Sequence, residues 1–435
     1  MRPDYLDDWA DLLVDYSLDI DEGDRFRVSF DYDAKPLAAA VIERAADEGA
    51  DVYYDINDSE LDRLSMKAAD EEQLQQPVPD HKLEEAEELD KRLHIRAPSN
   101  TSEMADIDPE KQQAAKQSPG RGELRKELLE NTDWSLTQYP TQALAQNAGM
   151  STEEYEEFVV EACVRDWEEE TRRYQELKQI VDDASEVRIK GEKTDLSFSI
   201  DGYNDLDRVG LYSDGTANVP GGEVFTTPEK HSFEGEIYFE LPAMVDGQEA
   251  KGMHLVFGDD GDIEEYAADK GEELLVEKIE TDDGSSFIGE FGIGTNKGID
   301  QATRDILFDE KIGGTIHLAV GNAYRKGIVA GAGAYDDVDH DEIGDERYDE
   351  LVDETVAALE DGSYGDVIDT HPNDERTVMS RIRDRYEELE AEKDSQQNQS
   401  VVHWDMIKDL RDNGELWLDD QLILEDGEFV GLDDL

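Results

Sequence analysis

An excess of negative charge is the feature that most constrains how this chain can fold. Acidic residues number 113 against 41 basic ones, for a formal net charge of −72. At low ionic strength such an anionic chain repels itself, whereas at molar salt the Debye length falls to about 3 Å and the repulsion is screened. The hydrophobic fraction of 37% is low, but Tyr, Trp and Phe are spread along the chain, unlike in disordered sequences. The sequence therefore predicts a folded protein with a solvated acidic surface, adapted to high salt.

The same charge limits the partners and the compartment. Nucleic acids and anionic membranes are not expected to bind, because they carry charge of the same sign. No stretch approaches the roughly 20 apolar residues of a membrane helix, and the acidic N-terminus is not typical of a signal peptide. The single cysteine, Cys163, excludes an internal disulfide and is typical of a reducing cytoplasm. It lies in EEYEEFVVEACVRDW, where a buried helical thiol is favoured over a nucleophile. We therefore expect a soluble, cytoplasmic protein.

Two domains are expected from the length of 435 residues, because single cores stop growing at roughly 250–300 residues. Residues 1–190 alternate between helical and strand-like spacing, which predicts an N-terminal α/β domain with an open sheet. Residues 191–435 are rich in glycine and in short alternating segments, which predicts a β-rich α+β catalytic domain. Within that domain, residues 266–279 are predicted to form a helix.

Residues 331–397 differ from the rest of the second domain. They are intensely acidic and continue into a charged helical pattern. Few apolar residues occur there, so we expect this segment to have no core of its own. We interpret it as a helical acidic insertion on the surface, between His317 and His403.

Side chains that bind metals interrupt several apolar or glycine-flanked segments. The run VVHWDMI places His403 and Asp405 on the same face of a strand, since positions i and i+2 point the same way. Glu223 in VPGGEVFTTP, Glu290 in FIGEFGIGTN and His317 in GGTIHLAVG have similar surroundings. A carboxylate in an apolar strand is costly to bury unless it is paired or metal-bound. Taken singly, each could be an ordinary polar residue of an acidic protein; together they match a pair of zinc, cobalt or manganese ions.

Such a pair of ions is suited to hydrolysis, because it can polarise a carbonyl group and activate water. Tyr324, seven residues after His317, could donate a hydrogen bond to the developing oxyanion. Glu223 or Glu290 could move the proton to the leaving group. The sequence does not distinguish between these two glutamates.

At these residues the chain resembles the thermophilic-type metallo-aminopeptidases, the family of aminopeptidases T and S. The resembling segments occur in the family's order: NVPGGEVFTTP, IGEFGIGTN, LFDEKIGGTIHLAVGNAY and NQSVVHWDMI. In the N-terminal half, DWSLTQYPTQALA matches more weakly. The resemblance implies a homodimer that removes N-terminal residues from peptides with two divalent ions, typically zinc or cobalt.

The resemblance also implies roles for individual residues. Tyr324 matches the family's active-site tyrosine. The implied metal ligands are Glu223, Glu290, Glu310, His317, His403 and Asp405. The other six histidines of the chain are not assigned a role, and His254 is expected to be an ordinary strand residue.

Residues 331–397 depart from the family, whose connection between the tyrosine and the HWD run is much shorter. The segment could add acidic surface, narrow the entrance of the site or cover it. Two other functions stay open: a non-catalytic acidic protein that binds cations or a partner, and a metal hydrolase of another amide or ester. The presence of every implied site residue favours an active enzyme.

Overall fold

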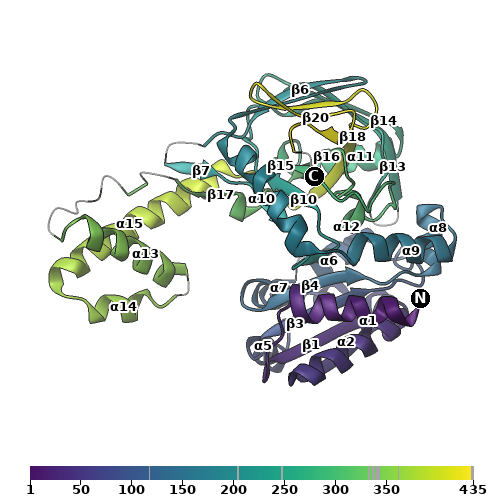
Figure 1. Ribbon diagram of the computed structural model, residues 1–435, viewed down its shortest axis with the longest axis horizontal. Helices are drawn as coiled ribbons and strands as arrows, with labels where there is room; N and C mark the ends of the chain where they lie inside the picture. Colours follow the sequence, from purple (N-terminus) through teal and green to yellow (C-terminus); the bar gives the residue numbers. More distant parts are fainter. Residues whose placement is uncertain are drawn as a thin grey trace.

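The chain forms a mixed α/β fold with several sheets, shown as a computed structural model in Figure 1. The structure describes residues 1–116, 118–202, 205–245, 248–331, 334–335, 338, 343–360 and 362–432. His340, one of the histidines without an assigned role, and parts of the 331–397 segment lie outside the described residues. None of the described helices is both long and apolar enough to cross a membrane.

The N-terminal part is built on a parallel sheet with strand order β2-β1-β3-β4-β9. Its strands are β1 (Arg25–Asp31), β2 (Asp51–Asn57), β3 (Lys91–Arg96), β4 (Asp133–Gln138) and β9 (Asn218–Val219). The helices are α1 (Pro3–Asp11), α2 (Lys35–Glu48), α3 (Ser59–Ala68), α4 (Glu71–Leu74), α5 (Asp80–Glu87), α6 (Pro109–Lys116), α7 (Pro119–Glu130), α8 (Gln142–Ala148), α9 (Thr152–Cys163) and α10 (Trp167–Asp183). Short helical turns occur at η1 (Leu12–Ser17) and η2 (Tyr32–Ala34).

Local sequence signals explain where these helices begin and end. Helix α9 starts with a capping box, in which Ser151 and Glu154 satisfy each other's backbone N–H groups. Helix α2 ends at Gly49, whose φ of 93° lies in the left-handed region that glycine tolerates. Cys163 ends α9 and is fully buried, which confirms the expectation of a buried helical thiol. Because Val219 belongs to the same core, residues beyond 190 contribute to this part, and the domain boundary at 190 stays a prediction.

Two antiparallel sheets form the second part. Sheet I has the order β18-β16-β15-β10-β8: β8 (Leu211–Ser213), β10 (Glu223–Thr226), β15 (Ile288–Gly294), β16 (Thr315–Gly321) and β18 (His403–Asp409). Sheet II contains β5 (Glu186–Gly191), β6 (Thr194–Ser199), β11 (Glu234–Phe239), β12 (Ala243–Val245), β13 (Gln248–Phe257), β14 (Ile263–Lys270), β19 (Glu415–Leu418), β20 (Gln421–Glu425) and β21 (Glu428–Phe429). Helices α11 (Glu272–Ile279) and α12 (Ile306–Asp309) lie between the strands in sequence.

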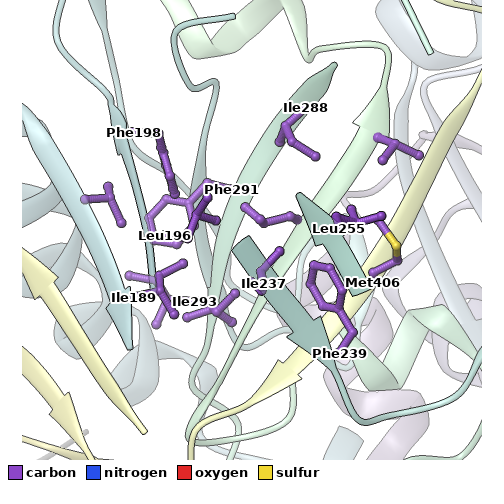
Figure 2. Packing of buried hydrophobic residues seen from close by; sticks show 14 of the residues in the cluster. Ile189, Leu196, Phe198, Ile237, Phe239, Leu255, Ile288, Phe291, Ile293 and Met406 are labelled. Carbon is purple, nitrogen blue, oxygen red and sulfur yellow. The ribbon is translucent and has the colours of Figure 1, made fainter. Parts of the chain in front are cut away.

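The core of this part lies between sheets I and II, as Figure 2 shows. Phe291 from sheet I lies beside Leu196 and Phe198 from sheet II, and Met406 from sheet I lies beside Phe239 from sheet II. The rings of Phe198 and Phe291 pack edge to face, with centroids 5.3 Å apart, an arrangement that aromatic pairs favour. One face of sheet I is therefore buried in an apolar core.

The prediction of a helix over residues 266–279 is partly wrong. Residues 263–270 form strand β14, which pairs with β13, and the helix is confined to α11. Gly271 has a φ of 76° and separates the two elements. Tertiary pairing with β13 overrides the helical spacing of the first few residues.

The acidic segment forms a helical arm that extends away from the rest of the molecule (Figure 1). Its helices are α13 (Asp345–Glu360), α14 (Tyr364–Thr370) and α15 (Asn373–Gln396). It joins the body beside the two-stranded ribbon of β7 (Leu206–Arg208) and β17 (Ile328–Ala330), which follows the helical turn η3 (Arg325–Gly327). The expectation that it has no core is wrong. A small cluster of buried residues holds the helices together: Val338, Tyr348, Leu351, Val378, Met379 and Ile382. That the segment is an insertion stays a prediction.

Truncation of a core aromatic is expected to destabilise the two-sheet part. Phe291 is 1% exposed, so Phe291→Ala should lower the free energy of unfolding by about 3–5 kcal/mol, through lost burial and a cavity. Urea unfolding in high salt measures this change. Tyr32→Ala, at a side chain that is 65% exposed, is the control and should change stability by less than about 0.5 kcal/mol. Equal stabilities of the two variants would contradict the packing described here.

Candidate metal centre

Strand alternation separates the two faces of sheet I. Four buried apolar residues point from its strands into the core between the sheets: Val224, Phe291, Leu318 and Met406. The residue directly before each of them in the chain therefore points to the opposite face: Glu223, Glu290, His317 and Asp405. His403 lies two residues before Asp405 on β18 and shares that face. The apolar pattern of the core thus determines where the metal-binding residue types lie.

The register of sheet I brings these side chains together across the strands. Ala319 on β16 pairs with Glu290 on β15 on one side and with Asp405 on β18 on the other. The alanine methyl group between the two carboxylates leaves room above the sheet. One ligand atom from each of Glu290, Asp405 and His403 lies within 4.8 Å of the other two, close enough to share one ion.

His317 lies across Gly292, its partner on the neighbouring strand. A Cβ atom at position 292 would lie 2.2 Å from the His317 Nε2 atom, so only glycine leaves space for the imidazole. The His317 Nδ1–H group donates to the Glu310 carbonyl oxygen at 3.1 Å. Nε2 consequently faces the carboxylates, at 3.1 Å from Glu290 Oε1 and 3.6 Å from Glu223 Oε2.

His403 is oriented in the same way. Its Nδ1–H group donates to the Asn322 carbonyl oxygen at 2.8 Å, and its Nε2 atom lies 3.6 Å from Asp405 Oδ2. A backbone carbonyl on one ring nitrogen fixes the tautomer that offers the other nitrogen as a metal ligand. Both imidazoles therefore present Nε2 to the same group of carboxylates.

Two carboxylate oxygens of the cluster have no hydrogen-bond partner. Glu290 Oε2 and Asp405 Oδ1 are buried, and neither bonds to any residue that the structure describes. An unpaired buried carboxylate oxygen is costly, and a divalent cation is the ligand that would satisfy both. The donor set, carboxylate oxygens with neutral imidazole, suits zinc, cobalt or manganese.

The pKa shifts in the cluster also indicate a need for positive charge. Burial and the nearby charge of Glu310 raise the pKa of Glu223 to about 7, and burial also raises the pKa of Glu290. Burial alone would lower the pKa of His317, but its hydrogen bond to Glu290 and the charge of Glu223 raise it to about 10. Without a cation, a protonated His317 therefore supplies positive charge to the carboxylates. A bound cation would supply that charge instead and leave the imidazole neutral.

Lys311 is a member of this group that the sequence analysis missed. Its side chain is fully buried, and Nζ lies 3.2 Å from Glu223 Oε1 and also contacts the Glu310 carboxylate. Glu310 follows α12, outside sheet I, and meets the cluster through Lys311 and through its own carbonyl oxygen. In the sequence, Lys311 stands between Glu310 and an apolar segment, and this position is a sign that it could be buried. Only the fold shows that Lys311 is in fact buried.

Tyr324 lies in the loop after β16, at the border of the cluster. The residue is 52% exposed, and its ring packs edge-on against the His403 ring, with centroids 5.2 Å apart. Partial desolvation and the charges of Glu290 and Asp405 raise the pKa of its hydroxyl group above the usual value. The hydroxyl group therefore stays protonated and can donate a hydrogen bond.

A methyl group at position 292 should displace the His317 ring. Gly292→Ala is expected to lower zinc affinity on the order of 10- to 100-fold, the effect of losing a group that orients a ligand, as measured by titration calorimetry. Gly365→Ala is the control, because an added Cβ there meets no described atom within 4 Å. Wild-type zinc affinity in Gly292→Ala would show that the position of His317 does not matter for binding.

His254 needs no special role. It lies on β13, with its side chain 32% exposed, and Nε2 is 2.7 Å from a Glu236 carboxylate oxygen. The expectation of an ordinary strand residue is confirmed.

Comparisons with known proteins identify the family of the chain. Residues 3–345 match the family model of thermophilic metalloproteases (M29). The chain is 27% identical to aminopeptidase 2 of Geobacillus stearothermophilus and 25% identical to aminopeptidase AmpS of Bacillus subtilis (strain 168), in each case over 75% of this chain and 86% of the relative. The solved structure of wild-type AmpT from Thermus thermophilus has the same fold, with a TM-score of 0.72 at 21% identity, covering 98% of this chain and 99% of that one. The chain belongs to the thermophilic metalloprotease (M29) family.

Proposed function

We propose that this protein is an aminopeptidase that uses two divalent metal ions to remove N-terminal residues from peptides. The observation that carries the proposal is the cluster of Glu290, His403 and Asp405, with its two unpartnered carboxylate oxygens. Membership of a metalloprotease family with relatives named aminopeptidases supports it. The family resemblance and the net charge also lead us to propose a homodimer that works in a cytoplasm of high salt.

We propose that the two ions would be held by five residues: Glu223, Glu290, His317, His403 and Asp405. Glu290 is central to this set, because Oε1 faces the His317 Nε2 atom while Oε2 has no partner among the described residues. Glu310 is proposed as a further ligand, although its carboxylate contacts Lys311. Zinc or cobalt, and also manganese, fit these donors.

When bound, the ions would polarise the scissile carbonyl and lower the pKa of a water molecule. Residues of the chain would stabilise the developing charge and transfer the proton. Tyr324, kept protonated, would donate a hydrogen bond to the oxygen on which charge develops. Glu223 or Glu290 would carry the proton to the leaving amine. The apolar face of sheet I would hold the strands, and hence these groups, in register.

We propose that the 331–397 segment is an insertion that adds acidic surface without covering the site. The arm extends away from the body (Figure 1). Its return to the body is anchored close to the site: Gln397 Nε2 donates to the Tyr324 carbonyl oxygen at 3.3 Å, and Asn398 Nδ2 to the Gly321 carbonyl oxygen at 2.5 Å. Among the described residues of the segment, those at the base of the arm therefore lie close to the site.

Removal of metal is expected to abolish the activity. After exhaustive chelation, release of N-terminal residues from short peptides in high salt should cease, and zinc, cobalt or manganese should restore it. The metal that restores the highest rate identifies the preferred cofactor. Undiminished peptidase activity in the chelated protein would contradict the proposal.

A matched pair of variants distinguishes the effect of removing a metal ligand from the effect of removing one negative charge. Glu290→Gln should reduce both metal affinity and peptide hydrolysis by more than the roughly 10- to 100-fold typical of residues that only orient a ligand. Glu265→Gln, at an exposed position of β14, makes the same change of charge and should leave both intact. If Glu290→Gln binds metal and hydrolyses peptides like Glu265→Gln, the assignment of Glu290 is wrong.

A further inference from the structure

A small cavity lies beside His403 and Asp405, at the edge of sheet I. Its volume is about 260 Å³, below the roughly 300–1,000 Å³ of pockets for drug-sized ligands, so it suits one or two amino-acid residues. Met244 and Ile306 are among its apolar lining residues, and Arg304 adds a guanidinium group. A substrate whose scissile bond reaches the carboxylate cluster would place a neighbouring part of its chain in this cavity.

The Arg304 guanidinium is held by a backbone carbonyl oxygen and by a long ion pair with Glu249, and these contacts do not use all of its donors. Nη1 donates to the Asn147 carbonyl oxygen at 2.5 Å, which fixes the side chain against α8. Nε lies 3.7 Å from a Glu249 oxygen, beyond hydrogen-bond distance, while Lys270 bonds to the same carboxylate at 2.5 Å. Nη2 donates to none of the described residues, and the side chain is 33% exposed. Donors of Arg304 are therefore available to a ligand.

The backbone at Arg304 has an unusual conformation that the Asp309 carboxylate stabilises. Its φ of 65° lies in the left-handed region, which is uncommon for a residue with a long side chain. The Asp309 carboxylate holds this conformation by accepting the backbone N–H groups of Thr303 at 2.6 Å and Arg304 at 2.8 Å. Asp309 is 2% exposed, and its oxygens are occupied by these bonds. Asp309 thus orients Arg304 without forming an ion pair with its guanidinium.

We propose that Arg304 binds a carboxylate group of the substrate, and so directs this enzyme to short peptides that carry a carboxylate next to the scissile bond. The inference rests on the proposed function and adds a substrate class to it. The cavity borders the buried Asp405 carboxylate, so a substrate carboxylate needs a local cation to bind there. The planar guanidinium matches a carboxylate through two parallel hydrogen bonds. The carboxylate could be the C-terminus of a dipeptide, or the side chain of an acidic N-terminal residue.

Two pairs of peptides distinguish these sources in the wild-type enzyme. Leu-Leu is compared with its C-terminal amide, and Glu-Leu amide is compared with Gln-Leu amide. The form with the carboxylate should have a KM on the order of 10- to 100-fold lower in at least one pair, with kcat changed little, as expected for a charged hydrogen bond. The pair that shows the preference identifies the source.

Variants test whether Arg304 causes the preference. Arg304→Gln should remove it, by raising the KM of the carboxylate form only, and Arg304→Lys should retain part of it. Arg96→Gln is the control: Arg96 bonds to Asp305 at 2.9 Å, beside the cavity but outside its lining, and this variant should keep the preference.

Three results would overturn the inference. The first is equal KM values for both members of both pairs in the wild type. The second is a loss in Arg304→Gln that is the same for carboxylate and uncharged forms, since this would indicate a purely structural role. The third is a failure of the metal-loaded wild type to hydrolyse any of the four peptides, which would overturn the proposed function as well.

Discussion

The structure depends on the burial of like charges on one face of a small sheet. Glu223, Glu290 and Asp405 are each at most 7% exposed, and His317 lies among them without any exposure. Buried carboxylates so close together can stay ionised only beside positive charge. Lys311 supplies one such charge at Glu223, while oxygens of Glu290 and Asp405 are left unpartnered. Divalent cations would complete the balance, and this requirement links the fold to the proposed chemistry.

The acidic residues of this chain therefore face two different physical situations. Those on the surface repel one another through water, and dissolved salt screens that repulsion. Those above sheet I are removed from water, where salt screens little, so they need partners bound at fixed positions. The helical arm belongs to the first situation, because its acids lie around a small apolar cluster of its own. The candidate metal centre belongs to the second.

Strand alternation is what made the centre predictable from sequence. Each candidate on the central strands directly precedes a core residue, as His317 precedes Leu318, so the pattern that builds the core also places the polar face. The mixed α/β fold and the residue types of the candidate site could be predicted from such local patterns and from the family resemblance. The roles of Lys311 and Arg304 could not be predicted in this way. The burial of Lys311 and the unused donors of Arg304 depend on contacts between distant segments of the chain. For the same reason the pairing of β14 with β13 and the core of the arm escaped prediction.

Gly292 shows the limit most clearly. In the sequence it is one glycine of a glycine-rich segment, and only the register of β15 against β16 shows that the His317 ring lies across it. Where the position of a residue depends on the register between two strands, the pattern of a single strand is not enough. The domain boundary at residue 190 also depends on strand pairing, because β9 lies beyond residue 190 in the chain but pairs with β4 in the parallel sheet.

Anomalous diffraction from crystals grown with cobalt tests the central claim most directly. We predict two anomalous peaks per chain on the polar face of sheet I, one among Glu290, His403 and Asp405 and one beside Glu223 and His317. Peaks confined to surface carboxylates, or no peak above sheet I, would contradict the account.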